Sequence, residues 1–152
     1  MDNDKKLLSN YVDIAVSNVD YINSGGCGIF AMLFGNKLES MGYDVDYIVL
    51  FRGKNCVKEI KGNNVIKPTD ILSCSWTHII LRVNGKYYID ADGVFNRLKQ
   101  MDNKDNRKRY PLVIDRQLLS EITNIKYIGH WNNMFNRSRG IKKLKGNLKL
   151  IN

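Results

Sequence analysis

The run WTHIILRVNGKYYIDADG at residues 76–93 limits the possible folds of this chain more than any other segment. Two stretches rich in β-branched and aromatic residues flank a Val-Asn-Gly sequence, and Asn-Gly in this setting is a strong signal for a β-hairpin. The expected hairpin has His78 at the start of its first strand and Asp90 at the end of its second. The chain must therefore build a sheet around this hairpin.

Apolar residues recur at helical spacing before the hairpin, within residues 5–18 and again within residues 27–42. The second of these helices is expected to begin at or beside Cys27 and to be buried. Residues 43–53 (YDVDYIVLFRG) alternate in the manner of a strand. The order helix, helix, then strands predicts an α+β fold in which the helix that begins at the cysteine packs on an antiparallel sheet.

A single domain over residues 1–152 is expected from the chain length, because domains of this size usually have one core.

The other segments give weaker signals. The remaining expectations are a loop-rich stretch at 53–75 interrupted by Pro68, a charged loop at 97–109, a short helix from around Asp115 and a basic tail at about 137–152.

Cys27 lies in the sequence NSGGCGIFA, at the start of the second helix. A helix N-terminus lowers the pKa of a thiol through its unpaired N–H groups and its dipole, which makes the thiolate a nucleophile. Gly26 and Gly28 would let a substrate chain approach closely, and the backbone N–H groups here could stabilise an oxyanion. The alternative interpretation is a small buried thiol that happens to precede an apolar helix.

A nucleophilic cysteine needs a base and a group that orients the base, and His78 with Asp90 could supply both. Their proximity depends on the hairpin loop. A two-residue turn, Asn84-Gly85, would place His78 opposite Ala91, with Asp90 on the other face. A three-residue loop, Val83-Asn84-Gly85, would make His78 face Asp90 directly, within hydrogen-bond reach. The sequence allows both loops, and Asp90 could also be a simple turn former.

The two runs GGCGIFAMLFGNKLESMGYDV and THIILRVNGKYYIDADG together resemble the transglutaminase-like branch of the papain-like cysteine peptidase superfamily. In that pattern a helix begins at the nucleophilic cysteine, the base histidine opens a strand, and an aspartate ends the next strand. The resemblance covers roughly residues 20–95. It implies a papain-like or transglutaminase-like core, with Cys27 as nucleophile, His78 as base and Asp90 as orienting acid.

This chain departs from the family pattern in one respect, since no upstream residue is a clear side-chain donor to the oxyanion. Asn23, Tyr21 and Trp76 are the candidates. A second histidine, His130 in the sequence IGHWNN, could pair with a downstream asparagine. It lacks a strand that carries such an asparagine at a suitable distance, and we expect it to be a surface or packing residue.

Cys56 and Cys74 are the other two cysteines. The spacing Cys74-x-x-x-His78 could serve two zinc ligands with Cys56 as a third, but no fourth ligand or paired motif accompanies them. We therefore expect two ordinary buried thiols, no metal and no cofactor. An odd cysteine count without CxxC spacing suits a reducing compartment, and the N-terminus lacks a secretory pattern, so the expected location is cytoplasmic.

The net charge of +9 is concentrated in two segments, at 97–109 and at 137–149. Such segments could bind an acidic protein or nucleic acid, although a solvated basic surface is the simpler interpretation. Neither segment interleaves aromatic residues with its charges as a platform for single-stranded nucleic acid does. No stretch approaches the roughly 20 apolar residues needed to span a bilayer, so no membrane partner is expected.

These features predict a cysteine-dependent acyl-transfer enzyme of protease, amidase, deamidase or transglutaminase type that acts on peptide or protein amides. The alternative is a non-catalytic binding protein on the same fold that uses its basic surface. The two differ in one respect, because only the enzyme requires the Cys27 thiol.

Overall fold

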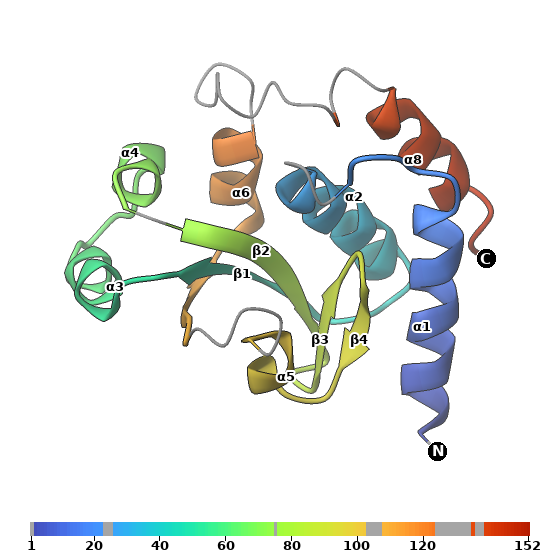
Figure 1. Cartoon of the computed structure of the whole chain (residues 1–152), viewed down its shortest axis with the longest axis horizontal. Helices are drawn as coiled ribbons and strands as arrows, with labels where there is room; N and C mark the ends of the chain where they lie inside the picture. The colour runs from blue at the N-terminus through green and yellow to red at the C-terminus, as the bar shows by residue number, and fades with distance from the viewer. Residues whose placement is uncertain (1, 23–25, 75, 103–107, 124–134, 136–138) are drawn as a thin grey trace.

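The computed structural model describes residues 2–22, 26–74, 76–102, 108–123, 135 and 139–152 (Figure 1). The helices and strands follow one another in the order α1 (Asn3–Val16), α2 (Cys27–Ser40), β1 (Val45–Phe51), α3 (Lys54–Lys61), α4 (Pro68–Leu72), β2 (Trp76–Val83), β3 (Tyr87–Asp90), β4 (Gly93–Phe95), α5 (Leu98–Asp102), β5 (Tyr110–Ile114), α6 (Arg116–Thr123) and α8 (Gly140–Leu148).

The five strands form one antiparallel sheet with the order β4-β3-β2-β1-β5. The strands β2, β3 and β4 are neighbours in sequence and in space, whereas β1 lies between β2 and β5. This arrangement confirms the α+β class predicted from the sequence.

Alternation along the strands divides the buried residues between the two faces of the sheet. Tyr47, Val49 and Phe51 belong to the main core, while Ile48 and Leu50 belong to a smaller cluster that includes Met101 of α5. A strand with both sets of side chains buried needs cover on both faces. Here the helices packed on the main-core face provide most of that cover, and α5 contributes on the other.

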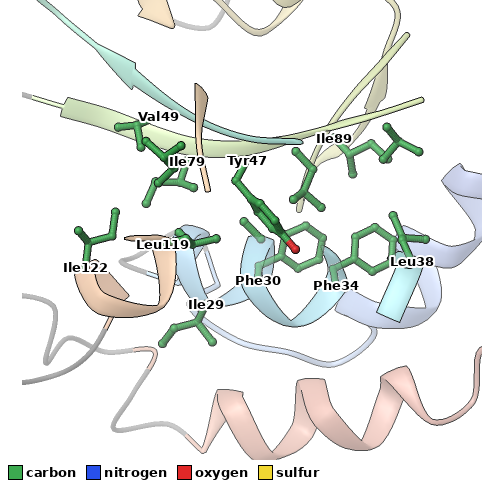
Figure 2. Packing of buried hydrophobic residues seen from close by; sticks show 14 of the residues in the cluster. Ile29, Phe30, Phe34, Leu38, Tyr47, Val49, Ile79, Ile89, Leu119 and Ile122 are labelled. Carbon is green, nitrogen blue, oxygen red and sulfur yellow. The ribbon is translucent and has the colours of Figure 1, made fainter. Parts of the chain in front are cut away.

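Helix α2 lies against the main-core face and begins at Cys27, as expected (Figure 2). Its apolar stripe places Phe30, Phe34 and Leu38 in the core, with the first two rings stacked at 5.1 Å between centroids. Gly35 permits the close approach of α2 to β1, because a Cβ atom at this position would lie 2.7 Å from the ring of Tyr47. The packing therefore fixes where the N-terminus of α2 stands relative to the sheet.

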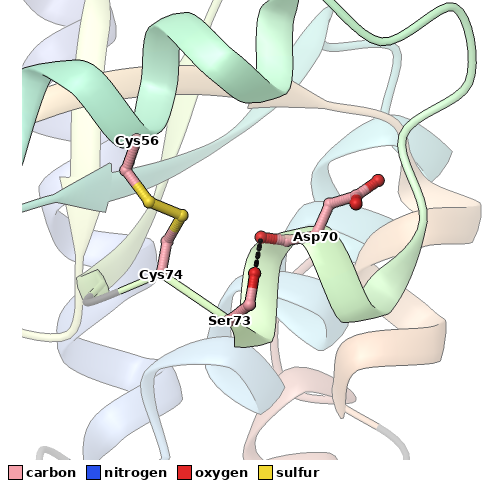
Figure 3. The surroundings of a disulfide bond; sticks show 4 residues. All are labelled: Cys56, Asp70, Ser73 and Cys74. Carbon is pink, nitrogen blue, oxygen red and sulfur yellow. Dashed lines mark hydrogen bonds between the residues drawn. A yellow bond between two sulfur atoms is a disulfide. The ribbon is translucent and has the colours of Figure 1, made fainter.

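The stretch 53–75 contains two helices, α3 and α4, which the loop-rich expectation missed. A disulfide joins Cys56 of α3 to Cys74, just before β2 (Figure 3). The expectation of two separate buried thiols was therefore wrong. Their spacing of 18 residues carries no recognisable motif, and only the fold brings the two Cα atoms to 6.1 Å.

Four further elements bear on the expectations for the second half of the chain. The helix expected from around Asp115 is confirmed as α6, which begins at Arg116. Strand β5 and helix α5 lie in segments for which no element was expected, and the basic tail contains α8. Among the described residues, none of the helices combines the length and apolar character that crossing a bilayer requires.

Candidate active site

Cys27 is the first residue of α2 and the one free cysteine of the described chain. The N-cap residue, Gly26, offers no side chain to the first helical turn, and its carbonyl accepts the first helical hydrogen bond, from the N–H of Phe30 at 2.8 Å. No capping side chain therefore competes for the N–H groups beside the sulfur. The Cys27 residue is partly exposed and packs against the main core.

Gly26 is required by space and not by its backbone angles, since its φ of −90° suits any residue. A Cβ atom at this position would lie 2.4 Å from the carbonyl oxygen of Ile22 and 2.9 Å from the Phe135 ring. The tight packing around Gly26 thus fixes the position of the neighbouring Cys27. The predicted role of Gly26, to let another chain approach Cys27 closely, stays a prediction.

His78 and Asp90 form the predicted pair, with 2.9 Å between His78 Nε2 and Asp90 Oδ2. The side chain of His78 is 18% exposed and that of Asp90 is 8% exposed, so the hydrogen bond is shielded from water. Asp90 also accepts a hydrogen bond at Oδ1 from the backbone N–H of Asp92, at 2.8 Å. Both carboxylate oxygens are therefore engaged, and this turn contact orients the acid that holds the histidine.

The hairpin register differs from both loops considered from the sequence. Val83 pairs with Tyr87 and Leu81 with Ile89, which leaves Asn84, Gly85 and Lys86 as the loop. Extended along the strands, this pairing makes His78 a diagonal neighbour of Asp90 and not its direct partner. Side chains alternate between the two faces of a sheet, so a register shift of two residues leaves His78 and Asp90 on the same face. The two side chains therefore still meet, although neither register considered from the sequence was right.

The turn itself accounts for this register. Asn84 and Gly85 both have positive φ, and the N–H of Lys86 donates to the carbonyl of Val83 at 3.0 Å. Asn84 is further fixed by Asp44, since the backbone N–H of Asp44 donates to Asn84 Oδ1 at 3.0 Å and the carbonyl of Asp44 accepts from the N–H of Asn84 at 2.7 Å. Pairing resumes one residue later than a two-residue turn would allow.

Cys27 also acts on the pKa of His78, which places its thiol close to the ring and brings the three predicted residues to one site. Since Nε2 of the ring bonds to Asp90, Nδ1 is the nitrogen left for the thiol. Burial lowers the pKa of His78, but the hydrogen bond to Asp90 and the interactions with Cys27 outweigh it and raise the pKa to about 9. The imidazole therefore lies between a carboxylate and a thiol.

The strand that carries His78 is irregular at this point. The pairing of β1 with β2 shifts by one residue between Leu50, which faces His78, and Phe51, which faces Trp76. A β-bulge of this kind re-aims the side chains beside it. The disulfide holds the chain at Cys74, four residues before His78, so the bulge and the disulfide both lie close to His78 in sequence.

The remaining predicted site residues have different outcomes. Gly28 is buried in the first turn of α2, next to Cys27. Trp76 begins β2, but its side chain, like the whole of Asn23 and His130, lies outside the described residues. Tyr21 is exposed. The predicted side-chain donor to the oxyanion thus stays a prediction.

The cysteines of the weak zinc alternative are both in the disulfide, so neither can supply a thiolate to a metal. Across the part of the chain that the structure describes, no group of three or more His, Cys, Asp and Glu side chains is arranged to hold a metal ion. The arrangement suits nucleophilic chemistry by a thiolate with an adjacent imidazole.

Sequence reasoning missed two contributors to this site. The pairing of Cys56 with Cys74 has no local signal. The backbone N–H of Asp92 does have one, because Asp-x-Asp-Gly commonly forms a turn in which the first carboxylate accepts from the N–H two residues later. Asp90 thus forms the turn and also bonds to His78.

Comparison with known proteins adds no family assignment: none of the protein-family models, curated proteins or solved structures searched matches this chain. The functional interpretation therefore rests on the residues and their geometry.

Proposed function

We propose that this protein is a cysteine-dependent acyl-transfer enzyme that acts on peptide or protein amide bonds. The observation that carries the proposal is the position of His78, which is hydrogen-bonded to Asp90 and lies beside Cys27, the first residue of a buried helix. A half-buried histidine placed by packing alone would need neither partner. The same arrangement supports the papain-like core and the transglutaminase-like relationship that the sequence suggested.

The first half of the reaction forms a thioester. The Cys27 thiolate attacks the carbonyl carbon of the amide, and the negative charge that develops on the oxygen is stabilised by backbone N–H groups at the start of α2. The C–N bond then breaks, and the His78 imidazolium gives its proton to the departing nitrogen. An amine or ammonia leaves, and the acyl group stays on the sulfur.

The second half releases the acyl group and restores the site. Neutral His78 takes a proton from water or from an amine, which attacks the thioester carbonyl, and the sulfur leaves as the thiolate with His78 protonated again. Water as the acceptor gives a protease, amidase or deamidase, and an amine gives a transglutaminase. Asp90 keeps Nδ1 of the ring directed to the sulfur throughout, because it binds Nε2.

The test is a reaction with mixed peptides that contain glutamine and asparagine, with and without a primary amine, followed by mass spectrometry. Backbone cleavage, side-chain deamidation and amine incorporation give different mass changes, so one experiment distinguishes the reaction types. The product must form with the wild-type protein and be absent with Cys27→Ser. A product that persists in Cys27→Ser, with the variant folded, contradicts the proposal.

The proposed location is the cytoplasm, on the basis of the sequence. The disulfide argues for a more oxidising environment, since cytosolic disulfides are usually transient, catalytic or redox-sensing. A cytoplasmic location therefore predicts that Cys56 and Cys74 are largely reduced in cells. Differential alkylation after acid quenching measures this directly, and full oxidation of the pair would place the protein elsewhere.

The second candidate function is a non-catalytic binding protein on the same fold. The observation in its favour is the exposed basic surface of α8, whose lysines are not part of the site around Cys27. Binding of this kind would weaken with salt and would be unaffected by Cys27→Ser. The mixed-peptide experiment separates the two functions, because a binding protein yields no product.

A further inference from the structure

Helix α8 carries an open groove of about 580 Å³. Four basic side chains line it, together with one apolar side chain and one glycine: Arg139, Lys142, Lys145, Lys149, Ile141 and Gly146. The four basic residues fall three or four positions apart, which places them along one side of the helix over roughly 15 Å. The lining of the groove is therefore mostly basic, and Ile141 forms its small apolar part.

The opposite side of α8 fixes the direction in which this groove faces. Leu144 and Leu148 are buried in the main core. Asn147 is also buried, and its side-chain amide donates to the carbonyls of Ala15 at 3.0 Å and Ser17 at 2.8 Å, at the end of α1. Packing and hydrogen bonds together keep the basic side turned outwards.

The first turn of α8 is tied to the start of α2 through one aromatic ring. Phe135 is fully buried, and a Cβ atom added at Gly140 would lie 2.3 Å from it. The same ring lies against Gly26, the residue before Cys27. The groove therefore belongs to a helix anchored next to the candidate nucleophile and is not a free tail.

The charges of the groove are not neutralised within the described part of the chain. The ion pairs seen there involve other basic residues, as in Arg82 with Asp46, Lys86 with Asp2 and Arg116 with Glu39. None of the four basic residues of the groove has an acidic partner among the residues described. A surface with four like charges within eleven residues attracts an anionic partner.

We propose that the α8 groove binds an acidic segment of another protein. The carboxylates of that segment pair with Lys142, Lys145 and Lys149, and one of its apolar side chains rests on Ile141. Gly146 leaves room for this side chain, because a Cβ atom there would meet nothing within 4 Å. The proposal concerns binding alone and does not depend on the chemistry at Cys27.

Two features favour a protein partner over other anions. None of the described residues that line the groove is aromatic, whereas proteins that hold single-stranded nucleic acid stack bases on such residues. The described lining also includes the apolar side chain of Ile141, which suits contact with an apolar side chain of a protein partner. The test therefore includes a nucleic acid and a membrane as competing partners.

The test measures fluorescence anisotropy of a short labelled peptide of glutamate and leucine, with the full chain at about 50 mM salt. An unlabelled single-stranded oligonucleotide and vesicles that contain phosphatidylserine serve as competitors. The key variant is Lys145→Glu. The matched control is Lys143→Glu, which makes the same charge change on the same helix at an exposed residue that does not line the groove.

The expected result is saturable binding that weakens as salt is raised. An exposed ion pair contributes a factor of about 1.4 to 5 in affinity, and charge reversal adds repulsion, so Lys145→Glu should weaken binding about tenfold. Lys143→Glu should weaken it by less than about twofold, and Cys27→Ser should leave it unchanged. Thermal unfolding monitored by circular dichroism checks that both charge variants are folded.

Three results would overturn the proposal. Equal losses in the two charge variants would mean that net charge alone governs binding. Tighter binding to the oligonucleotide or to the vesicles than to the peptide would assign the groove to that partner. No binding at about 50 mM salt would mean that the groove is only a solvated surface.

Discussion

Replacement of Asp90 by asparagine tests how the site is held together, because the change removes a charge and keeps the shape. The amide oxygen can still accept from the N–H of Asp92, so the turn should survive. The amide nitrogen, however, would face Nε2 of His78 as a donor. The ring would then carry its proton on Nδ1, which is the wrong tautomer for a base that takes a proton there.

The structure also gives the scale of this effect. The pKa of His78 rises from 6.5 to about 9 in spite of burial, which by itself lowers it. At about 1.4 kcal/mol for each pH unit, this is a net preference of about 3 kcal/mol for the charged ring, which Asp90 and Cys27 provide in addition to offsetting the effect of burial. Asp90→Asn should therefore lower the pKa of His78 by at least about one pH unit, while burial continues to oppose protonation.

The assay is a titration of the His78 ring by NMR in wild type and Asp90→Asn, with His130→Gln in both proteins to leave a single histidine signal. Each titration is repeated in the Cys27→Ser background, so that the contribution of the sulfur is measured separately. An unchanged pKa of His78 in Asp90→Asn would refute the reasoning, because the hydrogen bond to Asp90 would then not stabilise the imidazolium.

The same variant predicts a pH dependence of stability. The folded-state pKa of His78 lies above the unfolded value, so protonation of His78 stabilises the fold fully below pH 6.5, and this stabilisation is lost as the pH rises through about 9. The difference in free energy of unfolding between wild type and Asp90→Asn should therefore be largest below pH 6.5 and shrink towards pH 9. Urea denaturation at a series of pH values measures it, and a difference that grows with pH would contradict the assignment.

Three further changes have expected outcomes. Gly26→Ala should destabilise the fold by about 1–3 kcal/mol and slow the alkylation of Cys27, because the added Cβ would collide with the carbonyl of Ile22. Urea denaturation measures the first effect and mass spectrometry the second, and wild-type values for both would refute the steric role of Gly26. Removal of the disulfide by Cys56→Ser with Cys74→Ser should lower the free energy of unfolding by about 3 kcal/mol, because the bond closes an 18-residue loop in the unfolded chain. The denaturation midpoint measures this loss, and an unchanged midpoint would mean that the bond does not constrain the unfolded chain. Asn147→Leu should cost about 1–3 kcal/mol by the same measurement, because the buried carbonyl of Ala15 and the partly buried carbonyl of Ser17 lose their donor. Full stability would show that water replaces the amide.

The sequence predicted the parts of the fold that local patterns determine. The start of α2 at Cys27 follows from a glycine-rich turn before an apolar period, and the hairpin follows from Asn-Gly between β-rich runs. The contact between His78 and Asp90 was predicted through the wrong register. It was nevertheless confirmed, because a two-residue shift leaves both residues on the same side of the hairpin.

The missed features depend on contacts between distant segments. The approach of Cys56 to Cys74 requires α3 and α4 to be folded, and neither cysteine has a motif to announce it. Strand β5 forms because β1 offers an open edge, and its sequence YPLVI contains a proline that argues against a central strand but not against an edge strand. Such features follow from tertiary packing and not from local propensity.

The most direct test of the central claim is the rate at which iodoacetamide alkylates Cys27 at pH 6, measured by mass spectrometry in wild type and His78→Ala. A free thiol with a pKa of about 8.5 is less than about 1% thiolate at this pH and reacts slowly. The account predicts rapid alkylation of Cys27 in the wild type and a loss of at least about tenfold in His78→Ala. Slow alkylation in both proteins, or equal rates, would mean that His78 does not activate Cys27 and that the three residues are not a catalytic site.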